Sequence, residues 1–501
     1  MNLAAAIVSV VLFIVIWAYF RNNPMRHGRK FMVRRFVNWF PLGMTYAFLY
    51  MARYNLIVAK SALGVLMSNK DFGIIFGVGT GVYALSFLVN GPLVDRIGGK
   101  KGILIAAIGT AGANILMGVL AFLLLTNRLR TGMVAAFSAI YALNMYFQSY
   151  GAVSIIKVKA YWFHVRERGV FGAIFGALIS IGSYFAFDWG QGIVNLSAAA
   201  APADAGWAYH WCRRIFGASG GGDAVWAVFY IPAAILVAWA VIDLWLIKNT
   251  PEEAGFQPFD TCDASSGQMH LDFTAWQLVR KVLTSPVLLL IAVVELTSGV
   301  FRNSVVQWYQ PFTTQVKQPG AEFFLQNWGL LICIFGIIGG FAGGILSDKI
   351  FQSRRGPPAV ILCGAVLVMA LVMSAFLFTS PVIVGAAAVG IWMAGVGVTS
   401  LMSGTAATDF GGRKATATSS GIVDGFAYLG GSVQSFCLGP LVTSDWRWWP
   451  VFFIPFALIG GFVAIKIWHA LPPATRKYIA SVEGNHLIAG IAVEGTSGVQ
   501  G

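Results

Sequence analysis

The chain has 501 residues, of which 57% are hydrophobic and only 11% are charged, and its mean hydropathy is +0.73. Soluble domains carry about 25% charged residues, so this composition excludes a soluble enzyme, a disordered chain and a disulfide-rich secreted module. The formal net charge is +14, from 34 Lys and Arg against 20 Asp and Glu. We therefore expect an all-α integral membrane protein with nearly all of its chain in the bilayer.

Thirteen apolar segments are long enough for a transmembrane helix, which needs about 20 residues. The first, 4–20, is expected to be an uncleaved anchor, because it lacks a basic leader and bulky residues precede Arg21. The other twelve are expected at 36–59, 72–94, 102–125, 131–154, 169–190, 224–247, 283–308, 326–346, 358–378, 381–406, 416–442 and 447–468.

Basic residues alternate between successive loops, and this alternation predicts the topology. One set of loops and tails holds 24 of the 34 Lys and Arg, and the other set holds eight. Because cytoplasmic loops retain Lys and Arg, we expect the N-terminus outside and the C-terminus in the cytoplasm. The same distribution explains the positive charge without nucleic acid as a partner.

No pattern of residues predicts catalysis or a cofactor. The five cysteines are scattered, the six histidines fall in loops, tails or span ends, and there is no Walker-type phosphate loop. We therefore expect no metal, no cofactor and no enzymatic activity.

Polar stretches divide the twelve later helices into six and six. The expected units are an anchor helix with a basic linker (1–35), a first half (36–247), a cytoplasmic central loop (248–281), a second half (282–470) and a cytoplasmic tail (471–501).

The two halves share a loop pattern after their second helices. Residues 91–101 read GPLVDRIGGKK, and residues 344–349 read GILSDK. The charged groups can pair across helix ends and latch one face, so we expect them to govern conformational switching rather than to contact substrate. The pattern matches the loop signature of the major facilitator superfamily, which implies two pseudo-symmetric six-helix halves, here with one additional N-terminal helix. The proposed latch residues are Asp95, Arg96, Lys100, Asp348 and Lys349.

Two arginines, Arg53 and Arg302, lie inside the first span of each half. A charge at the bilayer centre costs about 2.5–3.5 kcal/mol on insertion scales. A guanidinium group can donate hydrogen bonds to two oxygens of one phosphate. We therefore expect the two arginines to bind a small anion at a midplane site between the halves. The alternative is that each arginine pairs structurally with a neighbouring acid.

Several segments resemble the organophosphate:phosphate antiporters, the family of glycerol-3-phosphate and hexose-6-phosphate transporters. The resemblance covers about 36–470 and implies a phosphate-ester site formed by the two arginines, alternating access, exchange for inorganic phosphate and a bacterial inner membrane. The segments that carry it are YAFLYMARYN (46–55), FQSYG (147–151), WF (162–163), RERG (166–169), NTPEEAG (249–255), Arg302 with QW (307–308), SDKIF (347–351) and FAYLGGS (426–432).

Further polar groups accompany the arginines in the expected spans. Glu295 lies seven residues before Arg302 on the same helical face, about 10.5 Å along the axis. Together with Asp424 it is expected to balance the charge of Arg302, and proton transfer is the alternative. Four tyrosines are candidates to line the substrate site, although local packing would also explain them: Tyr46, Tyr50, Tyr83 and Tyr428.

The sequence departs from the family at three cationic positions, which are here Phe87, Ile179 and Val423. The substrate therefore stays open within the class of small organic anions. Two other functions also stay open: a membrane receptor for sugar phosphates, which would contact a membrane partner through the leading helix, and a proton-coupled carboxylate symporter. A monomer is expected.

Overall fold

The computed structural model describes residues 3–21, 23–129, 131–164, 167–200, 206–216, 223–257, 280, 284–351, 354–406 and 416–470, with side chains except at 168–173, 348–349, 404–406 and 416–420. Within these ranges every regular element is a helix. The α-helices are α1 (Leu3–Arg21), α2 (Arg29–Leu63), α3 (Asn69–Ile97), α4 (Gly99–Leu125), α5 (Met133–Trp162), α6 (Arg168–Tyr184), α7 (Gly190–Ser197), α8 (Trp207–Phe216), α9 (Ala227–Leu246), α11 (Pro286–Val316), α12 (Glu322–Gln326), α13 (Trp328–Ile345), α14 (Gly356–Phe376), α15 (Pro381–Thr399), α17 (Thr416–Ser444) and α18 (Trp448–Lys466).

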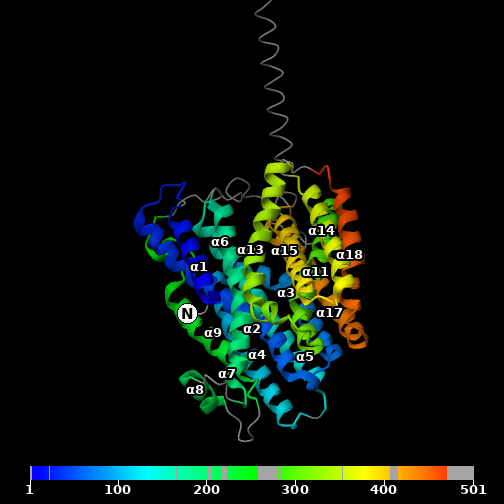
Figure 1. Cartoon of the computed structure of the whole chain (residues 1–501). Coiled ribbons are helices and arrows are strands. Elements are labelled where there is room, and N and C mark those ends of the chain that lie inside the picture. Colours follow the sequence, from blue (N-terminus) through cyan, green and yellow to red (C-terminus); the bar gives the residue numbers. More distant parts are fainter. Residues whose placement is uncertain are drawn as a thin grey trace, which may run out of the picture.

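The long helices form one bundle, shown in Figure 1. The first half runs from α2 to α9 and the second half from α11 to α18, and α1 precedes both. Three π-helical turns extend or interrupt the spans: η3 (Phe185–Trp189), η5 (Leu346–Ile350) and η6 (Ser400–Ala406). This arrangement confirms the predicted all-α membrane fold of two six-helix halves with one additional helix.

Nine of the described helices are long and apolar enough to cross a membrane. The helices α2 and α5 have the necessary length, with 35 and 30 residues, but are not among the nine. Their lower hydropathy has a structural reason, because they carry the polar side chains of the candidate site described below.

Four spans extend seven or eight residues beyond the expected bounds. Two of them are α5 and α11, which end at Trp162 and Val316 instead of at 154 and 308. The span expected at 36–59 is the middle of α2, which begins at Arg29 and ends at Leu63. The first turns of α2 contact the end of α9, because the Nη2 of Arg34 donates a hydrogen bond of 2.8 Å to the carbonyl of Leu246. The span expected at 169–190 continues through the π turn η3 into α7 and ends at Ser197. The expected tail, 471–501, and most of the expected central loop lie outside the described residues.

The halves pack against each other chiefly where α3 meets α17 and where α6 meets α13. The crossing of α3 and α17 is close because both helices have glycine at the contact. A Cβ atom on Gly73 would overlap the backbone of Ser435 and Gly439. Small residues allow this kind of backbone approach between membrane helices.

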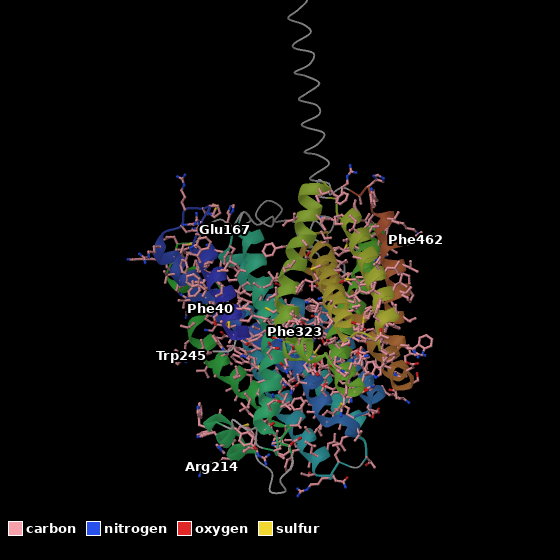
Figure 2. The ribbon with its side chains drawn as sticks, viewed as in Figure 1. Phe40, Glu167, Arg214, Trp245, Phe323 and Phe462 are labelled. Carbon is pink, nitrogen blue, oxygen red and sulfur yellow. The ribbon has the colours of Figure 1, made fainter. Side chains whose placement is uncertain are left out.

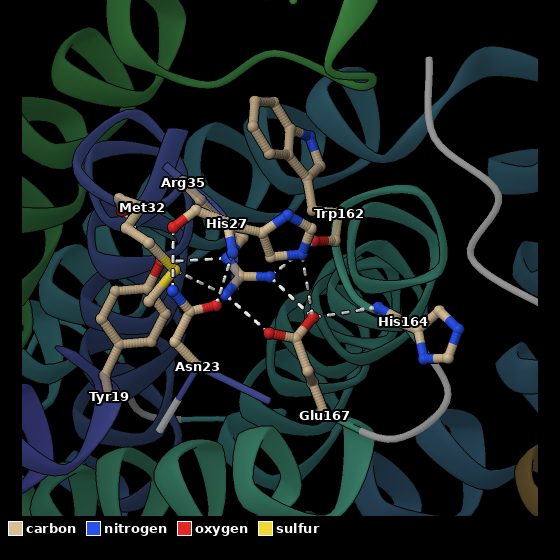
Figure 3. A network of polar contacts seen from close by, with 8 residues as sticks. All are labelled: Tyr19, Asn23, His27, Met32, Arg35, Trp162, His164 and Glu167. Atoms are coloured by element: carbon tan, nitrogen blue, oxygen red, sulfur yellow. Dashed lines mark hydrogen bonds and ion pairs between the residues drawn. The ribbon is translucent and has the colours of Figure 1, made fainter. Parts of the chain in front are cut away.

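The additional helix α1 packs against α6 and is joined to the first half by a buried polar cluster, drawn in Figure 3. The guanidinium group of Arg35 donates two hydrogen bonds to Glu167, of 2.8 and 2.9 Å, and a third of 3.0 Å to the hydroxyl of Tyr19 in α1. Paired bonds of this kind are strong and orient both partners. The cluster therefore fixes α1, α2 and the beginning of α6 relative to one another.

Candidate substrate-binding site

Arg53 lies near the middle of α2, and its side chain is 1% exposed. Its Nε donates a hydrogen bond of 2.8 Å to the Oε1 of Gln148 in α5, and its Nη1 donates one of 2.9 Å to the hydroxyl of Tyr428 in α17. Its Nη2 is buried and has no well-aligned acceptor among the described residues. The residue therefore links the two halves and keeps one N–H group without a well-aligned acceptor among the described residues.

Aromatic rings surround the Arg53 guanidinium group. Its central carbon lies 4.6 Å from the ring centre of Tyr50, 4.4 Å from that of Tyr83 and 5.6 Å from that of Tyr428. The Tyr83 and Tyr428 rings are 4.3 Å apart, and Tyr46 packs edge-on against Tyr50. All four predicted tyrosines thus lie around Arg53, where cation–π attraction compensates for the loss of water.

A chain of hydrogen-bonded, buried amide side chains supports Arg53 through Gln148. Gln148 donates to Asn144 at 3.2 Å, and Asn114 donates to the same Asn144 oxygen at 3.4 Å. Asn55 donates to Asn114 at 2.6 Å, so the chain returns to α2 two residues after Arg53. A fully bonded buried network fixes side-chain orientation, and this one orients the acceptor that Arg53 uses.

Arg302 lies in α11 and faces Glu295 of the same helix. The distance between Arg302 Nη2 and Glu295 Oε1 is 3.6 Å, and Glu295 is fully buried while Arg302 is 19% exposed. Helical side chains point toward the N-terminus of their helix, so the arginine reaches back over two turns to the acid. The Nε of Arg302 has no aligned acceptor among the described residues.

The two arginines share neighbours. Tyr50 and Tyr54 of α2 and Tyr428 of α17 are each close enough to interact electrostatically with both guanidinium groups. Asp424 interacts in the same way with Arg302 and Glu295. The structure therefore brings Arg53, Arg302 and their predicted companions into one region between the halves, where two guanidinium groups lie near two acids.

One end of the bundle is sealed between the halves, on the side opposite the basic loops. Asn69 of α3 and Gln315 of α11 exchange two amide hydrogen bonds, of 3.0 and 2.9 Å. Ser432 donates to the carbonyl of Gly77 at 2.8 Å. Among the side chains that the structure describes in both halves, no hydrogen bond or ring contact joins α3 to the second half beyond Phe87.

A carboxylate also closes this end. Asp188 in the π turn η3 accepts a hydrogen bond of 3.0 Å from the backbone N–H of Gly329, at the beginning of α13 in the other half. Negative charge is favoured at a helix N-terminus. Inserted π turns often occur at functional sites, and this one points an acid across the interface.

The structure shows a contact for only some of the predicted latch residues. Asp95 accepts a hydrogen bond of 2.9 Å from Lys157 of α5, so its observed partner is within its own half. The backbone N–H of Lys100 donates to the side chain of Asn249 at 2.9 Å, which joins the α3–α4 turn to the beginning of the central loop. Arg96 lies in the last turn of α3. The side chains of Asp348 and Lys349 lie outside the described residues.

A comparison with protein families decides the classification. Residues 42–435 match the family model described as Major Facilitator Superfamily. The chain belongs to this superfamily. It is therefore an integral, multi-pass membrane protein of a transporter superfamily, as its composition predicted.

Individual relatives confirm the predicted resemblance to organophosphate carriers. The chain is 22% identical to the membrane sensor protein UhpC of Salmonella typhimurium, over 89% of this chain and 95% of that protein. It is 24% identical to the glycerol-3-phosphate transporter of Bacillus subtilis, over 80% of this chain and 85% of that one.

Solved structures show the same fold. A bacterial homologue of the human lysosomal transporter Spinster superposes with a TM-score of 0.65 at 14% identity, covering 88% of this chain and 98% of that one. The nucleoside transporter NupG superposes with a TM-score of 0.55 at 15% identity, covering 85% and 100%.

Sequence reasoning assigned no role to Gln148, Asp188 or Asp243. Asp243 is fully buried in α9 and accepts a hydrogen bond of 2.6 Å from Thr45 of α2. The sequence could have indicated these residues, because an acid or amide inside an apolar span costs free energy in the membrane and often marks a functional site.

Proposed function

We propose that this protein is a secondary transporter that moves a small organic anion, a phosphate ester, across the membrane by alternating access. The observation that carries the proposal is the pair of arginines, one from each half, which share tyrosine neighbours. Each retains a guanidinium N–H without an aligned acceptor among the described residues. Buried donors of this kind cost free energy until a ligand accepts from them, and phosphate oxygens fit two guanidinium groups from opposite sides.

The names of the relatives support the same substrate class, because they include a glycerol-3-phosphate transporter and hexose phosphate carriers. The sealed end of the bundle supports alternating access, since a carrier must open one face at a time. In this conformation, ligand would enter from the face with the basic loops. We further propose that this face is cytoplasmic, that the N-terminus is outside and that the membrane is a bacterial inner membrane.

In the proposed cycle, Glu295 takes up a proton when substrate binds. The carboxylate competes with an anionic substrate for the same guanidinium group, because it lies 3.6 Å from Arg302 Nη2. Protonation of this acid would release Arg302 for the ligand. Transport is then expected to rise as pH falls from about 8 to 6, and Glu295→Gln or Asp424→Asn should flatten the response. A sulfate ester keeps the ligand charge constant in this range, whereas a phosphate ester has a second pKa near 6.

The function is tested by counterflow in proteoliposomes with radiolabelled glycerol 3-phosphate, hexose 6-phosphate and inorganic phosphate. Entry of labelled ester against internal unlabelled ester is the expected result, and entry driven by internal phosphate would establish exchange. A thermal-shift series against phosphate esters and dicarboxylates first selects the ligand. Stabilisation by carboxylates alone would support the proton-coupled carboxylate symporter instead.

A sensor is the second candidate, because UhpC, a membrane sensor protein, aligns over nearly the whole chain. The additional helix α1 has an exposed side that a membrane partner could contact. Ligand binding without appreciable counterflow would support the sensor and contradict the transporter.

A further inference from the structure

The short helix α8 lies at the end of the bundle that carries α7, beside the spanning helices (Figure 1). Three apolar side chains are spaced by four residues along it and form one stripe. Trp207 is 80% exposed, Trp211 is 60% exposed and Ile215 is 55% exposed. Large aromatic side chains are rarely displayed to water in this way. The transport proposal uses none of them.

The opposite face of α8 is attached to the bundle. Tyr209 and Cys212 are buried. The Tyr209 hydroxyl donates a hydrogen bond of 3.1 Å to the carbonyl of Ala198, and Phe216 stacks on Tyr230 of α9 with ring centres 6.2 Å apart. Because the inner face is fixed in this way, the stripe is held outward.

The polar residues beside the stripe are suited to lipid headgroups. His210 and Arg214 are exposed on the same side of α8 as the two tryptophans. Tryptophan is enriched where membrane meets water, and a guanidinium group binds phosphate oxygens. Amphipathic helices with this composition lie in the plane of the interface.

The outer surface of the helices that can span a membrane is apolar. Figure 2 shows Trp245 of α9 and Phe462 of α18 on the outer surface, and Arg214 on α8. Both aromatic side chains are exposed and belong to helices that are long and apolar enough to cross a membrane. The helix α9 begins beside α8, so the stripe lies at one end of a helix that can span the membrane and whose exposed side chains are apolar.

We propose that α8 is an interfacial helix. Its stripe of Trp207, Trp211 and Ile215 inserts at the headgroup level of one leaflet, and Arg214 contacts lipid phosphates. The helix would then anchor the end of the bundle that Asp188 and Gly73 seal.

Spin labels on the full chain in nanodiscs test the proposal. Trp211→Cys and Ile215→Cys report on the stripe, and Ala200→Cys, on an exposed residue between α7 and α8, is the matched control. The labelling background replaces Cys262 and the exposed Cys437 with serine. We expect the stripe labels to be several-fold less accessible than the control to a water-soluble nickel reagent, while remaining accessible to oxygen.

Nickel accessibility equal to that of the Ala200 label, at both stripe positions, would overturn the proposal. So would dipolar coupling between two labelled copies in one nanodisc, because a second chain would then cover the stripe. Arg214→Glu addresses the lipid phosphates. It should raise nickel accessibility at position 211 more in nanodiscs with phosphatidylglycerol than in phosphatidylcholine alone, and an equal response in both would contradict the phosphate contact.

Discussion

The carboxylate of Asp188, in the first half, accepts a hydrogen bond of 3.0 Å from the backbone N–H of Gly329, in the second half. One acid thus caps a helix of the opposite half at the sealed end. Removing a hydrogen bond to a charged group costs about 1.5–3 kcal/mol, which is a factor of about 10 to 150 in an equilibrium. We expect Asp188→Asn to shift the protein toward opening of this end by a factor in this range.

Hydrogen exchange at the beginning of α13 measures the shift caused by Asp188→Asn. Faster exchange of the Gly329 and Leu330 amides is expected. Asp223→Asn is the control, because Asp223 is exposed in the segment before α9. Equal exchange in Asp188→Asn and the wild type would show that the cap does not hold the seal.

The close crossing of α3 and α17 gives a second prediction. Gly73→Ala places a methyl group against the backbone of Ser435 and Gly439, so this end cannot close fully. We expect accelerated alkylation of cysteines introduced on the sealed face, and reduced transport. Gly91→Ala in the same helix is the matched control, since a Cβ atom there meets nothing within 4 Å. If both variants behave alike, helix propensity rather than closure explains the effect.

The third prediction concerns the arginines. Arg53→Lys and Arg302→Lys keep the charge but lose the planar guanidinium group, and lysine binds phosphate as a point charge. Each lost charge-assisted hydrogen bond is worth about 1.5–3 kcal/mol, so ligand affinity should fall about 10- to 150-fold. Isothermal titration with the selected ester measures the change. Normal transport by either variant would assign that arginine a structural role, with Glu295 as the partner in the case of Arg302.

A fourth prediction follows from the cluster at α1. Burial, together with the nearby charge of Arg35, holds the pKa of His27 below its usual value, although Glu167 opposes this effect. The unfolded chain therefore binds the proton more readily than the folded one. Stability should be constant well above pH 6.5 and should fall as the pH drops below this value.

Thermal unfolding in detergent at pH 7.5 and pH 5.5 checks the prediction for His27. His27→Gln should reduce the loss of stability at the lower pH, and His469→Gln, an exposed residue after α18, should not. Identical pH profiles for wild type and His27→Gln would contradict the assignment.

A fifth prediction concerns the position of α1 outside the proposed site. Deleting residues 1–20 removes Tyr19 but none of the groups around Arg53 or Arg302. Ligand affinity in the folded deletion variant should stay within a few-fold of wild type, while the unfolding temperature falls. Loss of affinity would place α1 at the site.

The helices and the two central arginines could be predicted because they depend on local properties. Apolar length predicts a span, and a charge inside a span marks a site, as for Arg53 and Arg302. The partners could not be predicted, because they depend on how helices rotate and cross. Gln148 is 95 residues from Arg53 in sequence. No local pattern places its amide rather than another polar group of α5 against the arginine.

Glu295 and Arg302 illustrate the same limit within one helix. Across their axial separation of about 10.5 Å, a direct contact requires side chains that reach along the helix. The observed 3.6 Å arises because the arginine side chain leans toward the N-terminus of α11. The sequence marks Asp188 as an acid inside a span, but its partner could not be predicted, because the π turn that rotates it toward α13 has no sequence signature.

The buried pair of Arg35 and Glu167 has a consequence for biosynthesis. The two residues are 132 positions apart. At about 5–20 residues per second, the ribosome needs roughly 7–26 s to make the second residue after the first. Residues 36–63 of α2 are made within this interval, while the guanidinium group of Arg35 still lacks its carboxylate. The contact that joins α1 and α2 to the beginning of α6 therefore forms only after Glu167 has been synthesised.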